Sequence, residues 1–114
     1  MKNRRQLHLV ADVGGTNVRF ALAYARDAQP VPFEERTYAG ADFVTLLVAI
    51  EHYLAEVGAR PARAAIAVAS PIDGDVVTMI NRTWSFSRTE LAHALGVQKL
   101  LVLNDFGAVA WAMP

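Results

Sequence analysis

The sequence predicts an α/β fold in which helices cover a mixed five-stranded sheet. Three observations lead to this prediction. Strand-like segments follow one another between residues 7 and 39, apolar residues recur at helical spacing from residue 42 to 57, and short apolar strands alternate with helical segments after residue 63. The expected order is β-β-β-α-β-α-β-α, with a hairpin inserted after the fourth strand.

The first three strands are predicted at residues 7–13, 17–24 and 33–39. The first, LHLVADV, is mostly apolar, and NVRFALAY follows it after a short GGT turn, so we expect these two strands to form a hairpin. In the third, FEERTYA, polar residues alternate with β-forming residues. Pro30 and Pro32 break any regular structure before it.

A helix is predicted from Asp42 to Val57. Its apolar residues recur at positions i, i+3, i+4 and i+7, which places them on one face. These residues are Phe43, Leu46, Leu47, Ile50, Tyr53, Leu54 and Val57. Gly58 and Pro61 end the pattern because both residue types terminate helices.

The second half of the chain alternates between strands and helices. RAAIAVASP, residues 63–71, is a buried strand, and an IDGD turn leads into a hairpin made of VVTMI and NRTWSFS. Ser87 stands three residues before Glu90, a capping-box spacing that predicts a short helix ending at Gly96. KLLVLND, residues 99–105, is another buried strand, and FGAVAWAMP opens a last helical pattern.

Composition limits the classes of partner. The 114 residues carry 11 Lys plus Arg and 11 Asp plus Glu, so no net field attracts nucleic acid or an anionic membrane. Cysteine is absent, which excludes disulfides and thiolate chemistry. No apolar run approaches the roughly 20 residues of a membrane-spanning helix. We therefore expect a cytoplasmic protein with small-molecule or protein partners.

The turn DVGGTN, residues 12–17, indicates phosphate binding. Glycines at the end of a buried strand let the backbone approach a ligand closely, and the amide groups of such a turn attract anions. The turn lacks the lysine of a Walker loop, and a strand follows where a dinucleotide fingerprint needs a helix. Asp12 would repel phosphate unless a cation lies between them, and Mg²⁺ meets this need.

The residues around the glycines offer further phosphate ligands. Thr16 and Asn17 can donate hydrogen bonds to phosphate oxygens, and Arg19 lies on the same strand face as Asn17. The alternative is a tight hairpin with Gly14 and Gly15 at positive φ and a solvated aspartate.

Asn104 and Asp105 end the last predicted strand. Ligands of open α/β sheets bind beyond the carboxyl ends of strands, so this position favours catalysis. Asn and Asp are also preferred helix N-caps, and this structural alternative stays open. If the two strands end at one crevice, Asp12 can hold Mg²⁺ on the phosphates while Asp105 accepts a proton from an incoming hydroxyl.

The segment MINRTWSFS, residues 79–87, combines hydrogen-bonding and apolar side chains, a mixture that binds sugars. Its candidate residues are Asn81, Thr83, Trp84 and Ser85. For Trp84 the alternative is packing of the hairpin onto the core.

Four motifs in order, ADVGGTNVRFAL, SPIDGD, INRTWSFS and LNDFGAVAWA, resemble the amino-terminal part of bacterial glucokinases, which belong to the superfamily of actin-like ATPases and sugar kinases. The resemblance covers nearly the whole chain. It implies that residues 1–114 form a ribonuclease-H-like lobe. A second, covalently continuous lobe, missing from this sequence, would then complete a cleft for the substrates.

The resemblance also assigns roles to individual residues. The phosphate loop of the family falls on Asp12, Gly14, Gly15, Thr16 and Asn17, and Asp12 would hold Mg²⁺ through water.

The glucose-contacting and catalytic pair of the family falls on Asn104 and Asp105, with Asp105 as the base, and its sugar loop falls on Asn81, Thr83 and Trp84. Two motifs depart from the family. PITGD reads PIDGD here, with Asp73 at the Thr position, and NHTWAFS reads NRTWSFS. Arg82 and Ser85 therefore leave the detail of the sugar loop open.

The function implied by the resemblance is transfer of the ATP γ-phosphoryl group to the 6-hydroxyl of glucose. Residues 1–114 alone are expected to be inactive. ATP and glucose would be the partners, and a homodimer stays open. Two alternatives remain: a sugar-sensing, non-catalytic domain of a regulator, and a kinase that uses another hexose or polyphosphate.

Overall fold

A computed structural model describes residues 7–24, 32–69, 72, 74–79 and 84–104. The elements are β1 (Leu7–Val13), β2 (Asn17–Tyr24), β3 (Phe33–Ala39), a 3₁₀ turn (Gly40–Asp42), α1 (Leu46–Val57), β4 (Arg63–Val68), β5 (Val76–Thr78), β6 (Ser85–Ser87), α2 (Arg88–Leu95) and β7 (Lys99–Leu103). The predicted order is confirmed up to β7. The helix predicted after it lies outside the described residues.

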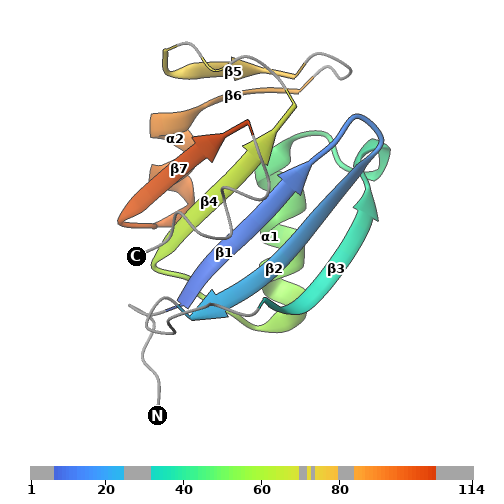
Figure 1. Ribbon diagram of the computed structural model, residues 1–114, viewed down its shortest axis with the longest axis vertical. Coiled ribbons are helices and arrows are strands. Elements are labelled where there is room, and N and C mark those ends of the chain that lie inside the picture. The colour runs from blue at the N-terminus through green and yellow to red at the C-terminus, as the bar shows by residue number, and fades with distance from the viewer. Residues whose placement is uncertain (1–6, 25–31, 70–71, 73, 80–83, 105–114) are drawn as a thin grey trace.

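The main sheet is mixed and five-stranded, as predicted. Its strand order is β3-β2-β1-β4-β7 (Figure 1). β1 pairs antiparallel with β2 and parallel with β4, and β4 pairs parallel with β7. The carboxyl ends of β1, β4 and β7 therefore meet at one edge of the sheet.

Helices α1 and α2 cover one face of this sheet, behind it in the view of Figure 1. Alternate residues of β1, β2, β4 and β7 point to that face and join the main core. On β2 these are Val18, Phe20 and Leu22, which share one buried cluster with Ile50 and Tyr53 of α1. The opposite face carries a smaller cluster of Val10, Ala23, Ala65 and Ala67.

Helix α1 begins later than the prediction from Asp42. Asp42 ends the 3₁₀ turn, and the hydroxyl of Thr45 accepts a hydrogen bond from the Val48 amide at 3.1 Å, which makes Thr45 the N-cap. Phe43 lies in the connection before the helix and packs on the core. Its apolar side chain therefore fits the helical spacing although the residue is not helical. At the other end Gly58 has a left-handed conformation and ends the helix as predicted.

Helix α2 confirms the predicted capping signal. The Ser87 hydroxyl accepts a hydrogen bond from the Glu90 amide at 3.1 Å, and Gly96 is left-handed at the C-cap. The hairpin before it is also present, as a two-stranded sheet of β5 and β6. Strand β6 runs directly into α2, which contacts both β6 and β7.

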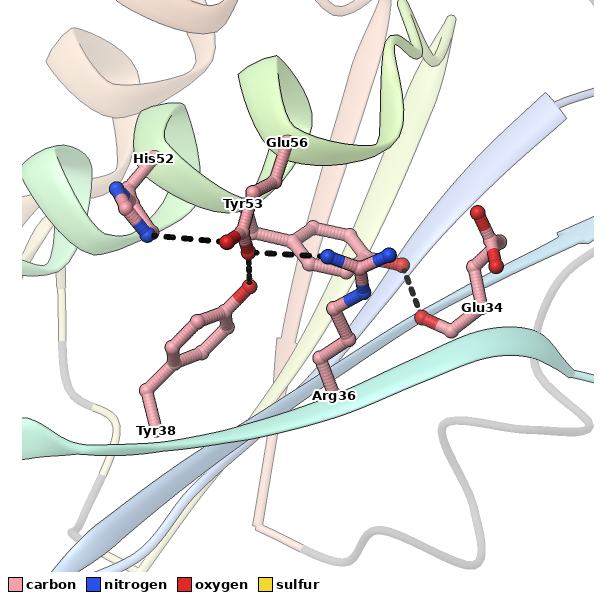
Figure 2. Close-up of polar contacts among 6 residues, drawn as sticks. All are labelled: Glu34, Arg36, Tyr38, His52, Tyr53 and Glu56. Carbon is pink, nitrogen blue, oxygen red and sulfur yellow. Dashed lines mark hydrogen bonds and ion pairs between the residues drawn. The ribbon is translucent and has the colours of Figure 1, made fainter.

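A polar cluster joins the edge strand β3 to α1 (Figure 2). The carboxylate of Glu56 on α1 accepts a hydrogen bond from the Tyr38 hydroxyl and lies 3.2 Å from Nη1 of Arg36 and 3.8 Å from Nε2 of His52. Beneath it, the Tyr53 hydroxyl donates to the Glu34 carbonyl at 2.8 Å. These contacts hold the outer strand against the helix.

None of the helices described in this structure is long and apolar enough to cross a membrane.

Candidate active site

The candidate site is the edge where the three parallel strands end. Asp12 on β1 is in register with Ala67 on β4, and Ala67 is in register with Leu103 on β7. With strands about 4.8 Å apart, the backbones of Asp12 and Leu103 lie about 10 Å from each other. Asn104 follows Leu103 directly, so residues far apart in the sequence share this edge.

Asn104 is fixed to the neighbouring strand end. Its side-chain Nδ2 donates to the carbonyl of Val68 at 3.4 Å, and Val68 is in register with Val13 at the end of β1. This contact ties the end of β7 to the end of β4. Asp105, the predicted base, lies outside the described residues.

The glycine turn between β1 and β2 is exposed and anchored from behind. The Gly14 amide donates to the Asn17 carbonyl at 2.9 Å, and the Gly40 amide donates to the Thr16 carbonyl at 2.9 Å. Gly15, Thr16 and Asn17 are exposed. Within the described part of the chain, no hydrogen bond engages the amide N–H of Gly15 or Thr16. These two donors can therefore face an anion.

Glycine is favoured at position 14 because the turn leaves little space for a side chain there. Among the described glycines, positive φ angles occur at Gly58, Gly74 and Gly96, so the alternative with Gly14 and Gly15 at positive φ is not supported. A Cβ atom on Gly14 would instead lie 3.3 Å from the Asn17 carbonyl oxygen, a tight contact.

Asp12 forms an ion pair that the sequence analysis did not predict. Its Oδ2 lies 3.2 Å from Nη2 of Arg19, its cross-strand partner on β2. The two side chains are 35% and 46% exposed, Asp12 and Arg19 respectively, so solvent and ligands can reach both. An acid and a guanidinium therefore lie side by side next to the glycine turn.

The residues present fit a magnesium–phosphate group. The described residues contain no cluster of three or more acidic or histidine side chains that could enclose a metal ion alone. Mg²⁺ on nucleotides keeps most of its waters and needs only one or two carboxylates besides the phosphates. A single exposed carboxylate, Asp12, beside two unengaged amides satisfies that requirement.

Trp84 is part of the core. Its side chain is buried, and its indole Nε1 donates to the Phe43 carbonyl at 3.2 Å. This packing favours the structural alternative considered for Trp84 over direct sugar contact. Asn81 and Thr83 lie outside the described residues, and Ser85 is exposed on β6.

The connection between β3 and α1 bonds to both the glycine turn and the β5–β6 hairpin, which the sequence pattern did not reveal. Gly40 donates its amide to Thr16 in the glycine turn, and Phe43 accepts the indole N–H of Trp84 in the hairpin. Both bonds use backbone atoms of the connection, so no residue type marks them in the sequence.

Comparison with known proteins gives a consistent result. The sequence model of the glucokinase family matches residues 9–114. The chain is 52% identical over 108 residues to the bifunctional protein glk of Burkholderia lata, covering 93% of this chain and 16% of that protein. It is 44% identical over 106 residues to the glucokinase of Tolumonas auensis, covering 93% of this chain and 32% of that protein.

Solved structures agree with the fold. A glucokinase from an Antarctic psychrotroph superposes with a TM-score of 0.83 at 44% identity, over 90% of this chain and 33% of that chain. A glucokinase from Balamuthia mandrillaris, solved in complex with glucose, superposes with a TM-score of 0.62 at 23% identity, over 87% of this chain and 29% of that chain. The second likeness concerns the fold alone. The chain spans about a third or less of the length of these relatives.

Proposed function

We infer a phosphoryl-transfer function from one premise, that this chain belongs to the glucokinase family. Membership in a kinase family implies the use of ATP. We propose that residues 1–114 act as the amino-terminal lobe of a longer enzyme that transfers the γ-phosphoryl group of ATP to the 6-hydroxyl of glucose. A second lobe, continuous with this chain, would close the cleft and supply the remaining contacts.

The observation that carries this proposal is the common edge of β1, β4 and β7. Asp12 and the glycine turn lie at one end of it, and Asn104 lies two strands away. Transfer between two substrates requires donor and acceptor sites side by side, because the reacting atoms must come within about 3.5 Å of each other. An edge that brings these polar groups together suits that requirement.

In the proposed donor site, Gly15 and Thr16 bind phosphate oxygens through their amides, and Thr16 and Asn17 add side-chain donors. Asp12 would hold Mg²⁺. The magnesium ion neutralises phosphate charge when it is bound. Glycine at position 14 keeps the turn tight against Asn17.

In the proposed acceptor site, Asn104 and Asp105 contact the sugar, and Asn81 and Thr83 add hydrogen bonds. Asp105 orients the 6-hydroxyl and takes its proton as the phosphoryl group arrives, an effect worth about 10² to 10⁴ in rate. Phosphoryl transfer otherwise depends on positioning and charge stabilisation, which suits a site made of backbone amides and few carboxylates. We assign Trp84 to positioning, because its ring is buried and its indole N–H is engaged.

The proposal is tested in the full-length protein with a coupled assay of sugar phosphorylation, across several hexoses and with ATP or polyphosphate as donor. We expect glucose and ATP to be preferred and Asp105→Asn to lower kcat by about 10²-fold or more while glucose still binds. A near-normal kcat in Asp105→Asn would remove Asp105 from the role of base. Sugar binding without turnover in the parent protein would instead favour the non-catalytic sensor.

The isolated 114 residues provide a second test. Because the second lobe would supply the remaining ligands, we expect no glucose phosphorylation by this chain alone. Appreciable turnover by the isolated chain would contradict the two-lobe proposal.

A further inference from the structure

Asp75 connects the two ends of the β5–β6 hairpin. It stands directly before β5, and its carboxylate accepts hydrogen bonds from residues at the end of β6 and the start of α2. The donors are the Ser87 hydroxyl, the Thr89 amide at 2.9 Å and the Thr89 hydroxyl at 2.6 Å. The backbone carbonyl of Asp75 also accepts the Arg88 amide at 2.8 Å. Three consecutive residues, 87 to 89, are therefore bonded to this one aspartate.

The hairpin needs such an attachment because it is short. β5 and β6 pair through three residue positions, and an isolated two-stranded hairpin is at most marginally stable in water. At its far end, the Met79 amide donates to the Trp84 carbonyl at 3.0 Å, and the Trp84 indole is bonded to Phe43. Trp84 thus fastens one end of the hairpin, and Asp75 fastens the other.

The carboxylate of Asp75 is occupied by these contacts. Both of its oxygens accept hydrogen bonds, Oδ2 from Ser87 and Oδ1 from Thr89. Hydrogen bonds from Ser87 and then Thr89 hold the pKa of the Asp75 carboxyl below its ordinary value. Asp75 is therefore a charged anchor at neutral pH, and its hydrogen bonds are directed at the protein.

The hairpin belongs to the sugar side of the proposed site. It follows the carboxyl end of β4, which is one of the three strand ends at the candidate site. The residues that join Met79 to Trp84 include Asn81 and Thr83, two of the proposed sugar ligands. The glycine turn, in contrast, is anchored through Gly40 and makes no hydrogen bond with the described part of the hairpin.

We propose that Asp75 is a positioning residue for the sugar substrate, which fastens the β5–β6 hairpin to α2 and so sets the place of the sugar-binding side relative to the nucleotide turn. The inference rests on the proposed function for its substrate. Its structural content, that Asp75 holds the hairpin, is independent of that function.

The test compares three changes in the full-length protein. Asp75→Ala removes the carboxylate but keeps the backbone carbonyl that accepts from Arg88. Thr89→Val keeps the shape of the side chain and removes one donor, so it is a milder version that serves if Asp75→Ala does not fold. Glu90→Gln is the matched control: it removes one negative charge from the same first turn of α2 and leaves the Asp75 contacts intact.

We expect Asp75→Ala to raise KM for glucose roughly tenfold, because a small displacement of binding groups weakens a positioned contact, while KM for ATP changes less than about twofold. Thr89→Val should shift the same constant in the same direction by a smaller factor. Glu90→Gln should leave both constants unchanged. Equal changes in the two KM values, or no change in either, would overturn the positioning role.

Amide hydrogen exchange separates this inference from the proposed function. Asp75→Ala should lose protection across β5 and β6, residues 76–78 and 85–87, while β1 and β4 keep theirs. If the parent protein phosphorylates no sugar, the proposed function fails, and the exchange experiment still decides whether Asp75 holds the hairpin. Unchanged protection of the hairpin in Asp75→Ala would refute the anchor.

Discussion

Asp12 and Arg19 face each other across the first hairpin, with Oδ2 and Nη2 3.2 Å apart. An exposed pair of this kind contributes little to stability, because solvent screens it. Its consequence is chemical: the only cation bonded to Asp12 in the described structure is a side chain that could itself approach phosphate. The roles of the two residues can therefore be separated by changing each one alone.

We predict that Asp12→Asn in the full-length protein lowers the proposed kcat/KM for ATP by about 10²-fold and weakens the dependence of rate on Mg²⁺ concentration. Arg19→Gln should reduce the same constant much less. The measurement is a Mg²⁺ titration of initial rates for both variants. If Arg19→Gln proved as damaging as Asp12→Asn, the aspartate would act through the ion pair and not through magnesium.

The glycine turn predicts different outcomes at its two glycines. Gly15→Val adds a side chain on the exposed part of the turn and should weaken ATP affinity at least tenfold with little change in Tm, as about 1.4 kcal/mol of binding free energy is tenfold. Gly14→Ala places a Cβ atom 3.3 Å from the Asn17 oxygen and should lower Tm as well. Calorimetric ATP titration and thermal unfolding of both variants give the comparison. Unchanged ATP affinity in Gly15→Val would count against the turn as the phosphate site.

The N-cap of α1 predicts a loss of stability away from the site. Thr45→Ala removes the hydroxyl that accepts the Val48 amide and should cost about 1 kcal/mol in the free energy of unfolding. Thr45→Ser, which keeps the hydroxyl, is the control and should lose much less. Denaturant unfolding of the two variants decides, and equal stabilities would mean that the cap contributes nothing.

The Tyr38–Glu56 hydrogen bond predicts a pH dependence. The hydrogen bond from Tyr38 is the main reason that the pKa of Glu56 lies below its ordinary value of 4.5. A lowered folded-state pKa means that this contribution to stability is present above pH 4.5 and is lost as the pH falls through the lowered value. Burial first, and then the bond to Glu56, raises the pKa of Tyr38 to about 12, so its contribution is complete below pH 10 and is lost as the pH rises towards 12.

The difference in Tm between the parent protein and Tyr38→Phe should therefore be constant between about pH 5 and 10 and should shrink below about pH 4. The difference in Tm between the parent protein and Glu56→Gln should also shrink below about pH 4, because protonation removes from the parent the carboxylate charge that this variant lacks. A difference that persists undiminished at pH 3 would contradict this assignment.

Local sequence patterns predicted the first three strands accurately, whereas β4 and β7 end before the predicted residues 71 and 105. The bounds of β1, β2 and β3 agree with prediction because an alternating pattern, a glycine turn and a proline each mark an end. The predicted start of α1 at Asp42 was wrong, because Phe43 fits the helical period although it lies before the N-cap at Thr45. Periodicity reports which residues are buried, and a residue in a connection can be buried too.

The candidate site was predictable where it depends on topology. Once β1, β4 and β7 are parallel, their carboxyl ends must share an edge, so Asp12 and Asn104 were expected to lie near each other. The pairing of Asp12 with Arg19 depends on the register of the first hairpin and was not foreseen. The anchoring of Asp75 depends on which hydroxyls meet at the start of α2, which spacing alone does not determine.

The connection between β3 and α1 has a consequence for how the two halves of the proposed site could move. The Gly40 amide is hydrogen-bonded to Thr16 in the glycine turn, and the Phe43 carbonyl accepts the indole N–H of Trp84. Both loops are therefore attached to the same short connection. A shift of that connection would displace the proposed donor and acceptor loops together, so the proposed spacing between the two substrates would change little with small motions of the lobe. Substitutions that bend this connection would alter the spacing between the two loops without contacting either substrate.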